Sequence, residues 1–128
     1  MSVDRVIGID LGTTNSALAW ADPRGPIRIF DVAQLVAAGE PGTQPTLPSF
    51  LYFPTAAEVE SGAARLPWAP ASDLVAGAFA RDHGALMPGR QVSSTKSWLS
   101  NALVDRTAPL LNEAVPCHFN FADLRAAI

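Results

Sequence analysis

A short polar loop follows the first apolar run of the chain and combines residue types that suit phosphate binding. In the stretch IGIDLGTTNS, Asp10 precedes Gly12, Thr13, Thr14 and Asn15. Gly12 has no side chain to block an approaching anion, and the N–H groups and hydroxyls that follow can converge into a nest of donors. Asp10 would repel a phosphate unless a cation lay between them. Mg²⁺ binds through few carboxylates plus water and phosphate oxygens, so a magnesium-bound nucleotide fits this loop.

An ordinary hairpin turn is the alternative interpretation of this loop, because Asp, Gly, Thr and Asn are all common in turns. The loop also matches neither the G-x-x-x-x-G-K-[ST] pattern nor the G-x-G-x-x-G pattern of nucleotide-binding proteins. Residue chemistry alone therefore leaves phosphate binding and a plain turn equally open.

Lys96 is the second candidate for anion chemistry. The sequence around it predicts a helix that begins near Ser93 or Ser94 and carries Lys96, Trp98 and Leu99. A cation in the first turn of a helix is opposed by the helix dipole, so a nearby anion would explain its position. The alternative is a solvated surface lysine, which is the commonest state of this residue.

Composition and charge exclude several classes of protein. The 128 residues are 48% hydrophobic, which favours a folded domain, or part of one, over a disordered chain. The net charge of -3 and the scattered Lys and Arg residues argue against nucleic acid as a partner. No apolar run reaches membrane-spanning length, no signal peptide precedes Asp10, and Cys117 has no second cysteine to pair with. We expect a cytoplasmic chain with no membrane or nucleic-acid partner.

The elements that would position the loop are predicted from the residue pattern around it. Residues 3–9 and 16–21 are typical of a hairpin joined across Gly12, and residues 27–30 follow a strong turn signal as a third strand. Together they predict a three-stranded antiparallel meander. The remaining expected elements are, in chain order, an irregular stretch at 33–48 with at most one helical turn at 33–38, a strand at 49–53, a loop at 54–71, a short strand at 74–75 and a helix at 76–86.

Several other residues have side chains capable of chemistry but are expected to be structural. His83 lies on a mostly apolar helix face, and we expect it to be packed or exposed at the surface rather than catalytic. Cys117 and His118 lack the further ligands that a zinc site requires. The tryptophans, which we expect in the core or at an interface, are Trp20, Trp68 and Trp98.

Three stretches together resemble the heat shock protein 70 (DnaK-like) chaperone family. VIGIDLGTTNSALAW is similar to its first phosphate loop, TLPSFLYF to its Thr-Pro-Ser segment and following strand, and VAGAFARDHGALMPGRQVSSTKSWL to its helix, turn and catalytic-lysine segment. The order and spacing of these three stretches agree with those of the family, apart from one insertion around 33–44. The loop alone is shared with the wider actin-like superfamily, including sugar kinases, and the Lys96 segment narrows the resemblance.

The resemblance implies an α/β fold. This would be the N-terminal lobe of a ribonuclease H-like (actin-like ATPase) domain, with a mixed sheet that begins with the meander and is incomplete in this chain. Residues 1–100 would be the N-terminal part of the nucleotide-binding domain, and residues 101–128 are an unassigned tail without clear resemblance.

The resemblance also implies cofactors, site residues and partners. ATP or ADP and Mg²⁺ would be the cofactors, with Asp10 near the Mg²⁺ through its waters. Lys96 would be catalytic, close to the γ-phosphate and the attacking water. In a full-length protein, unfolded client peptides and co-chaperones would be the partners. The residues that would hold the phosphates are Gly12, Thr13, Thr14 and Asn15.

The chain departs from the family pattern in two ways. Ser97 follows Lys96 where the family usually has an arginine, which suggests a divergent branch. Residues 17–128 contain no second run of Asp with Gly-Gly or Gly-Thr. We therefore expect an ATP-binding lobe fragment of a DnaK-like chaperone that is inactive alone. The alternatives are a fragment of another actin-like ATPase or sugar kinase, a noncatalytic scaffold protein, and a degenerate product.

Overall fold

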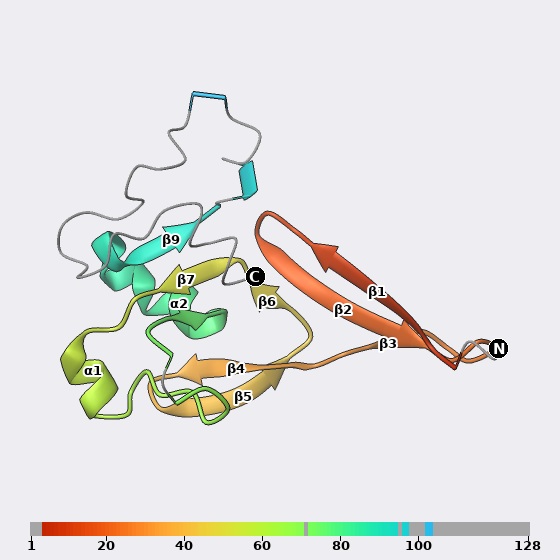
Figure 1. The fold of residues 1–128 in the computed structure, drawn as a ribbon, viewed down its shortest axis with the longest axis horizontal. Helices are drawn as coiled ribbons and strands as arrows, with labels where there is room; N and C mark the ends of the chain where they lie inside the picture. Colours follow the sequence, from red (N-terminus) through yellow and green to blue (C-terminus); the bar gives the residue numbers. More distant parts are fainter. Residues whose placement is uncertain (1–3, 71, 95, 98–101, 104–128) are drawn as a thin grey trace.

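The computed structural model describes residues 4–70, 72–94, 96–97 and 102–103, and it has a mixed α/β fold built from antiparallel sheets (Figure 1). Some residues with expectations from the sequence lie outside the described ones: Val3, Trp98, Leu99, Cys117, His118 and the rest of the tail from residue 104. The strands are β1 (Val6–Leu11), β2 (Asn15–Ala21), β3 (Arg28–Ile29), β4 (Val32–Ala37), β5 (Glu40–Gln44), β6 (Leu47–Pro48), β7 (Phe50–Tyr52), β8 (Val75–Ala76) and β9 (Gln91–Ser93). The helices are α1 (Ala56–Glu60) and α2 (Ala78–Asp82), followed by the 3₁₀ turns η1 (Gly84–Leu86) and η2 (Pro88–Arg90).

The predicted antiparallel meander is confirmed as β1, β2 and β3. Figure 1 shows β1 and β2 as a long arm that projects from the rest of the molecule. β1 continues through Asp10 to Leu11, so the acidic residue lies inside the strand, opposite Ala17. Short strand β6 pairs with β2 at Asn15 and Ser16, next to the loop. This pairing connects the arm to the body.

The outer edge of β1 is open. Within the described residues β1 pairs with β2 alone. The side chains of Ile7, Ile9 and Leu11 are 63%, 66% and 57% exposed, so this strand contributes little to the core. An edge with unpaired backbone groups and exposed apolar side chains is a surface that other strands can join.

The expectation of an irregular stretch over 33–48 is wrong, because β4 and β5 form an antiparallel hairpin there. Gly39 makes the turn with a φ of +67°, a conformation that glycine adopts without steric cost. Pro41 lies in β5, where a two-stranded sheet leaves a free edge that tolerates proline. Leu35 of β4 is fully buried, so the hairpin is held by the core rather than by its local sequence.

The core lies in the body, between the β4–β5 hairpin, the sheet β8-β7-β9 and helix α2. The strand expected at 49–53 is confirmed as β7, and the short strand expected at 74–75 is observed one residue later as β8. β9 was not predicted. The buried cluster comprises Leu35, Tyr52, Ala64, Val75, Phe79 and Ala80, with Phe50 and Leu66 packed against it.

The helices differ from expectation in length and position. Helix α1 lies in the stretch expected to be a loop, and it begins with a capping box in which Thr55 and Glu58 bond to each other's backbone N–H groups. The helix expected at 76–86 is shorter: α2 ends at Asp82 and continues as the 3₁₀ turn η1. Among the described residues, no helix has the length and apolar character needed to cross a bilayer.

Gln34 is a buried polar side chain that ties the β4–β5 hairpin to α2. Its side chain is 2% exposed, its Oε1 accepts from the N–H of Ala78 at 2.9 Å, and its Nε2 donates to the carbonyl of Thr46 at 2.9 Å. The Ala78 bond satisfies one of the N–H groups left free at the start of a helix. Gln34 therefore replaces the capping side chain that Gly77, the residue before α2, lacks.

Replacing Gln34 with alanine is expected to lower the free energy of unfolding by about 1–2 kcal/mol, because it leaves the Ala78 N–H and the Thr46 carbonyl without their partner. Urea unfolding followed by fluorescence measures the change. The control is Gln44→Ala in β5, where the side chain makes no hydrogen bond in the described structure, and a change below about 0.5 kcal/mol is expected. Equal losses in the two variants would contradict the capping role.

Candidate functional site

Lys96 and the polar loop converge, although they are 85 residues apart in sequence. The Nζ atom of Lys96 donates a hydrogen bond to the carbonyl oxygen of Leu11, the residue before Gly12. Strand pairing explains the approach. β9 pairs with β7 so that Ser93 lies opposite Phe50, and β6, two residues before Phe50, pairs with β2 at the loop. The chain that leaves β9 therefore approaches the loop at the end of the β1–β2 arm nearest the body (Figure 1).

The segment that carries Lys96 differs in detail from the predicted helix start. Ser93 belongs to β9, and Ser94 has a φ of +55°, in the left-handed region. Lys96 and Ser97 are helical, and the Ser97 N–H and hydroxyl both donate to the backbone carbonyl of Ser94. Ser94 therefore turns the chain sharply between β9 and Lys96, and its backbone rather than its side chain receives the hydrogen bonds.

The loop itself is a tight turn that requires glycine at position 12. A Cβ atom added to Gly12 would lie 2.1 Å from the carbonyl oxygen of Asn15, a distance that no side chain can accept. The geometry of the turn thus explains why position 12 is a glycine. From the sequence, the expected reason was that glycine leaves room for an approaching anion. Thr13 and Thr14 are exposed, and their backbone N–H groups have no hydrogen-bond partner in the described structure. These two donors remain available to a ligand.

Asp10 lies at one end of a shallow pocket on the face of the sheet. The pocket has a volume of about 300 Å³ and exists because its neighbours on that face are small. The Asp10 carboxylate is exposed and makes no ion pair or hydrogen bond with the described residues, Lys96 included. The residues that line the pocket are Gly8, Ile9, Asp10, Ala17, Leu18, Ala19 and Ile29.

The loop region has few side chains that could hold a metal. Among the described residues no three His, Cys, Asp or Glu side chains gather at one place, so Asp10 is the single carboxylate at the loop. Mg²⁺ is commonly bound by one or two carboxylates together with waters and phosphate oxygens. An ammonium group has three N–H donors, so Lys96 keeps two after its bond to Leu11.

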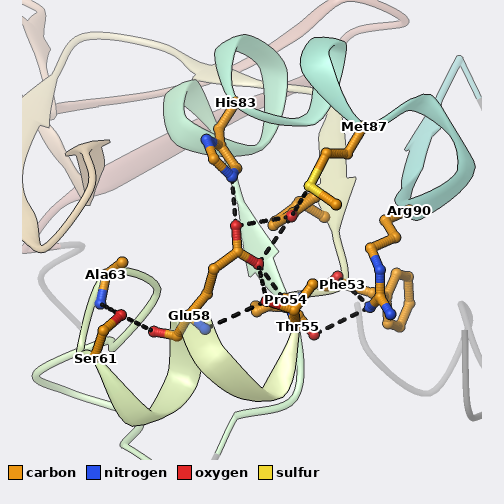
Figure 2. A network of polar contacts seen from close by, with 10 residues as sticks. Phe53, Pro54, Thr55, Glu58, Ser61, Ala63, His83, Met87 and Arg90 are labelled. Carbon is orange, nitrogen blue, oxygen red and sulfur yellow. Dashed lines mark hydrogen bonds and ion pairs between the residues drawn. The ribbon is translucent and has the colours of Figure 1, made fainter.

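A second polar cluster surrounds Glu58 and joins helix α1 to the body (Figure 2). The Glu58 carboxylate accepts from the Tyr52 hydroxyl at 2.9 Å, from the Thr55 N–H at 2.7 Å, and is 2.5 Å from Nε2 of His83. The His83 ring stacks on Phe79 at 4.7 Å, so of the two expected placements the structure shows the packed one. No buried side-chain nitrogen or oxygen in the described residues lacks a partner. The buried polar atoms of the cluster are therefore satisfied within the described structure.

The same contacts shift two pKa values in the cluster. Burial alone would raise the pKa of Glu58, but the hydrogen bonds donated by Thr55, His83 and Tyr52 outweigh it and lower the pKa to about 2. Burial, followed by the hydrogen bond to the Glu58 carboxylate, raises the pKa of Tyr52 to about 12. Glu58 is therefore an anion and Tyr52 a neutral donor across the ordinary pH range.

Sequence reasoning missed two residues that organise these sites. Ser49 contacts the loop directly: its hydroxyl donates to the Gly12 carbonyl and its N–H to the Thr14 carbonyl. No pattern around Ser49 predicts this contact, because it depends on strand pairing. The role of Glu58 at the start of a helix could have been predicted, because Thr55 and Glu58 have the spacing of a capping box. The roles assigned to Asp10, the 12–15 loop and Lys96 stay predictions, and the observed contact among them is the hydrogen bond from Lys96 to the Leu11 carbonyl, next to the loop.

No protein-family model, curated protein sequence or solved structure matches this chain.

Proposed function

We propose that this chain is an ATP-binding lobe fragment of a DnaK-like chaperone, with the beginning of a ribonuclease H-like fold. Its 10–15 loop and Lys96 bind the phosphates of Mg-ATP. The observation that carries this proposal is the contact between Lys96 Nζ and the Leu11 carbonyl, because it brings a distant cation to the donor-rich loop. In a longer protein, client peptides and co-chaperones are the corresponding partners.

The exposed groups of the loop support phosphate binding over a plain turn. Thr13 and Thr14 present unpaired N–H groups, and Lys96 adds positive charge beside them. A nest of N–H donors next to a cation attracts a polyphosphate. Asp10 opposes the same anion unless Mg²⁺ lies between them, which makes the proposed binding dependent on magnesium.

Calorimetric titration with Mg-ATP is expected to detect binding by the wild-type chain. Lys96→Ala is expected to weaken the affinity about tenfold, because it removes charge-assisted hydrogen bonds worth about 1.4 kcal/mol. Chelating the magnesium is expected to weaken ATP binding by wild type and to affect Asp10→Asn less, because the asparagine does not repel the phosphates.

Arg24→Ala is the matched control for Lys96→Ala. Arg24 is an exposed cation in the turn between β2 and β3, at the end of β2 opposite the loop. This variant is expected to bind Mg-ATP as wild type does. The proposal fails if the wild-type chain shows no binding at millimolar Mg-ATP, or if Lys96→Ala and Arg24→Ala have the same affinity.

A further inference from the structure

Ser49 occupies the joint between the two parts of the fold. It follows β6, which pairs with β2 of the arm, and precedes β7, which pairs with β8 and β9 in the body. Pro48, immediately before it, is fully buried, and proline has a fixed φ. The backbone of Ser49 is therefore held by the strands on both sides of it.

From this position Ser49 bonds to two peptide groups of the loop. Its Oγ donates to the Gly12 carbonyl at 2.9 Å, and its N–H donates to the Thr14 carbonyl at 2.9 Å. The described peptide bonds are all trans, so the N–H of each peptide group points away from its own carbonyl. The N–H groups of Thr13 and Asn15 consequently face away from Ser49.

These contacts also remove carbonyl oxygens from the path of an anion. A carbonyl oxygen carries partial negative charge and repels phosphate, so a loop that binds phosphate must turn its carbonyls aside. The Leu11 carbonyl is engaged by Lys96, and the Gly12 and Thr14 carbonyls are engaged by Ser49. Three of the four carbonyls from Leu11 to Thr14 are thereby held by donors from outside the loop.

We propose that Ser49 is a positioning residue for phosphate binding, which clamps the 12–15 loop with its N–H donors turned toward the ligand. This inference rests on the proposed function and adds to it the residue that shapes the site. Ser49 acts through the loop and does not itself touch the nucleotide. Its hydroxyl is the part of the clamp that mutation can remove, because the backbone N–H bond to Thr14 is retained in any variant other than proline.

The test compares Ser49→Ala with Ser49→Thr, which restores a hydroxyl, and with Ser72→Ala as a matched control. Ser72 also donates its hydroxyl to a backbone carbonyl, that of Leu74 at 2.8 Å, but outside the loop. The amide order of Thr13, whose N–H shares a peptide group with the Gly12 carbonyl, is measured by heteronuclear NOE on the isotope-labelled full chain without ligand, and Mg-ATP affinity by calorimetry. Ser49→Ala is expected to lower the amide order and to weaken Mg-ATP binding five- to tenfold. Ser49→Thr is expected to restore both properties, and Ser72→Ala to change neither.

Each outcome decides the inference. Unchanged amide order in Ser49→Ala overturns the clamp, whatever the nucleotide result. A looser loop with unchanged Mg-ATP affinity overturns the positioning role. A wild-type chain that binds no Mg-ATP overturns the proposed function and the role of Ser49 in phosphate binding, while a looser loop in Ser49→Ala would then establish the clamp as a feature of the turn alone.

Discussion

Replacing Gly77 with alanine is expected to lower the free energy of unfolding by about 3–5 kcal/mol. Gly77 has φ +96° and ψ -144°, a region open almost only to glycine. A Cβ atom there would lie 2.5 Å from Oε1 of Gln34 and 2.7 Å from Cδ1 of Leu47. The variant would therefore strain the backbone and displace the buried Gln34 side chain from the N–H of Ala78. Urea unfolding at neutral pH measures the loss.

Gly8→Ala is the control for this prediction. An added Cβ at Gly8 meets no atom within 4 Å, so a change below about 0.5 kcal/mol is expected. The double variant Gly77→Ala/Gln34→Ala tests the mechanism, because the clash with Oε1 is gone once Gln34 is shortened. Its loss should be smaller than the sum of the two single losses, by more than about 0.5 kcal/mol. Additive losses would show that the clash with Gln34 is not the cause.

Lowering the pH from 6 to 2.5 is expected to cost the chain about 2–3 kcal/mol of stability through Glu58 alone. Hydrogen bonds hold the pKa of Glu58 at about 2 in the folded chain, against an ordinary value of 4.5. The unfolded chain therefore binds this proton more tightly. The contribution of Glu58 is complete above its ordinary pKa and disappears as the pH falls toward 2. The Glu58 side chain is 17% exposed, so solvent screening is limited.

The contribution of Glu58 is isolated by comparing variants across the same pH interval. Glu58→Gln cannot gain a proton and is expected to lose about 2–3 kcal/mol less than wild type between pH 6 and 2.5. Glu60→Gln removes an exposed carboxylate from the same helix and should keep the wild-type pH dependence. Urea unfolding at both pH values provides the measurement. Parallel pH profiles for wild type and Glu58→Gln would rule out the predicted linkage.

The Glu58 cluster also explains how a short helix is retained on the surface. Helix α1 buries none of its residues, so it gains little from apolar packing. The Glu58 carboxylate instead ties it to Tyr52 of β7 and to His83 after α2. Polar contacts thus replace the apolar stripe by which helices usually attach to a core.

Local patterns in the sequence were sufficient where neighbouring residues decide the conformation. The meander follows from alternating apolar residues and from the turn after Ala21, and β7 from a dense apolar run between two prolines. The capping box of α1 is also a local pattern that could have predicted its helix, but the prolines on either side of it favoured a loop. The β4–β5 hairpin was not predicted from the sequence, for a different reason. Its glycines and prolines indicate irregular chain, and burial of Leu35 outweighs them.

The sequence by itself determined the chemistry available to this protein: an acidic residue, a glycine turn, paired threonines and a lysine of suitable type. The tertiary structure decided whether these groups meet, because the distance between Lys96 and the loop depends on the pairing of β9 with β7 and of β6 with β2. It also placed the hydroxyl and N–H of Ser49 against the Gly12 and Thr14 carbonyls. Strand pairing joins residues far apart in the chain, and a pattern that extends over neighbouring residues carries no information about such distances.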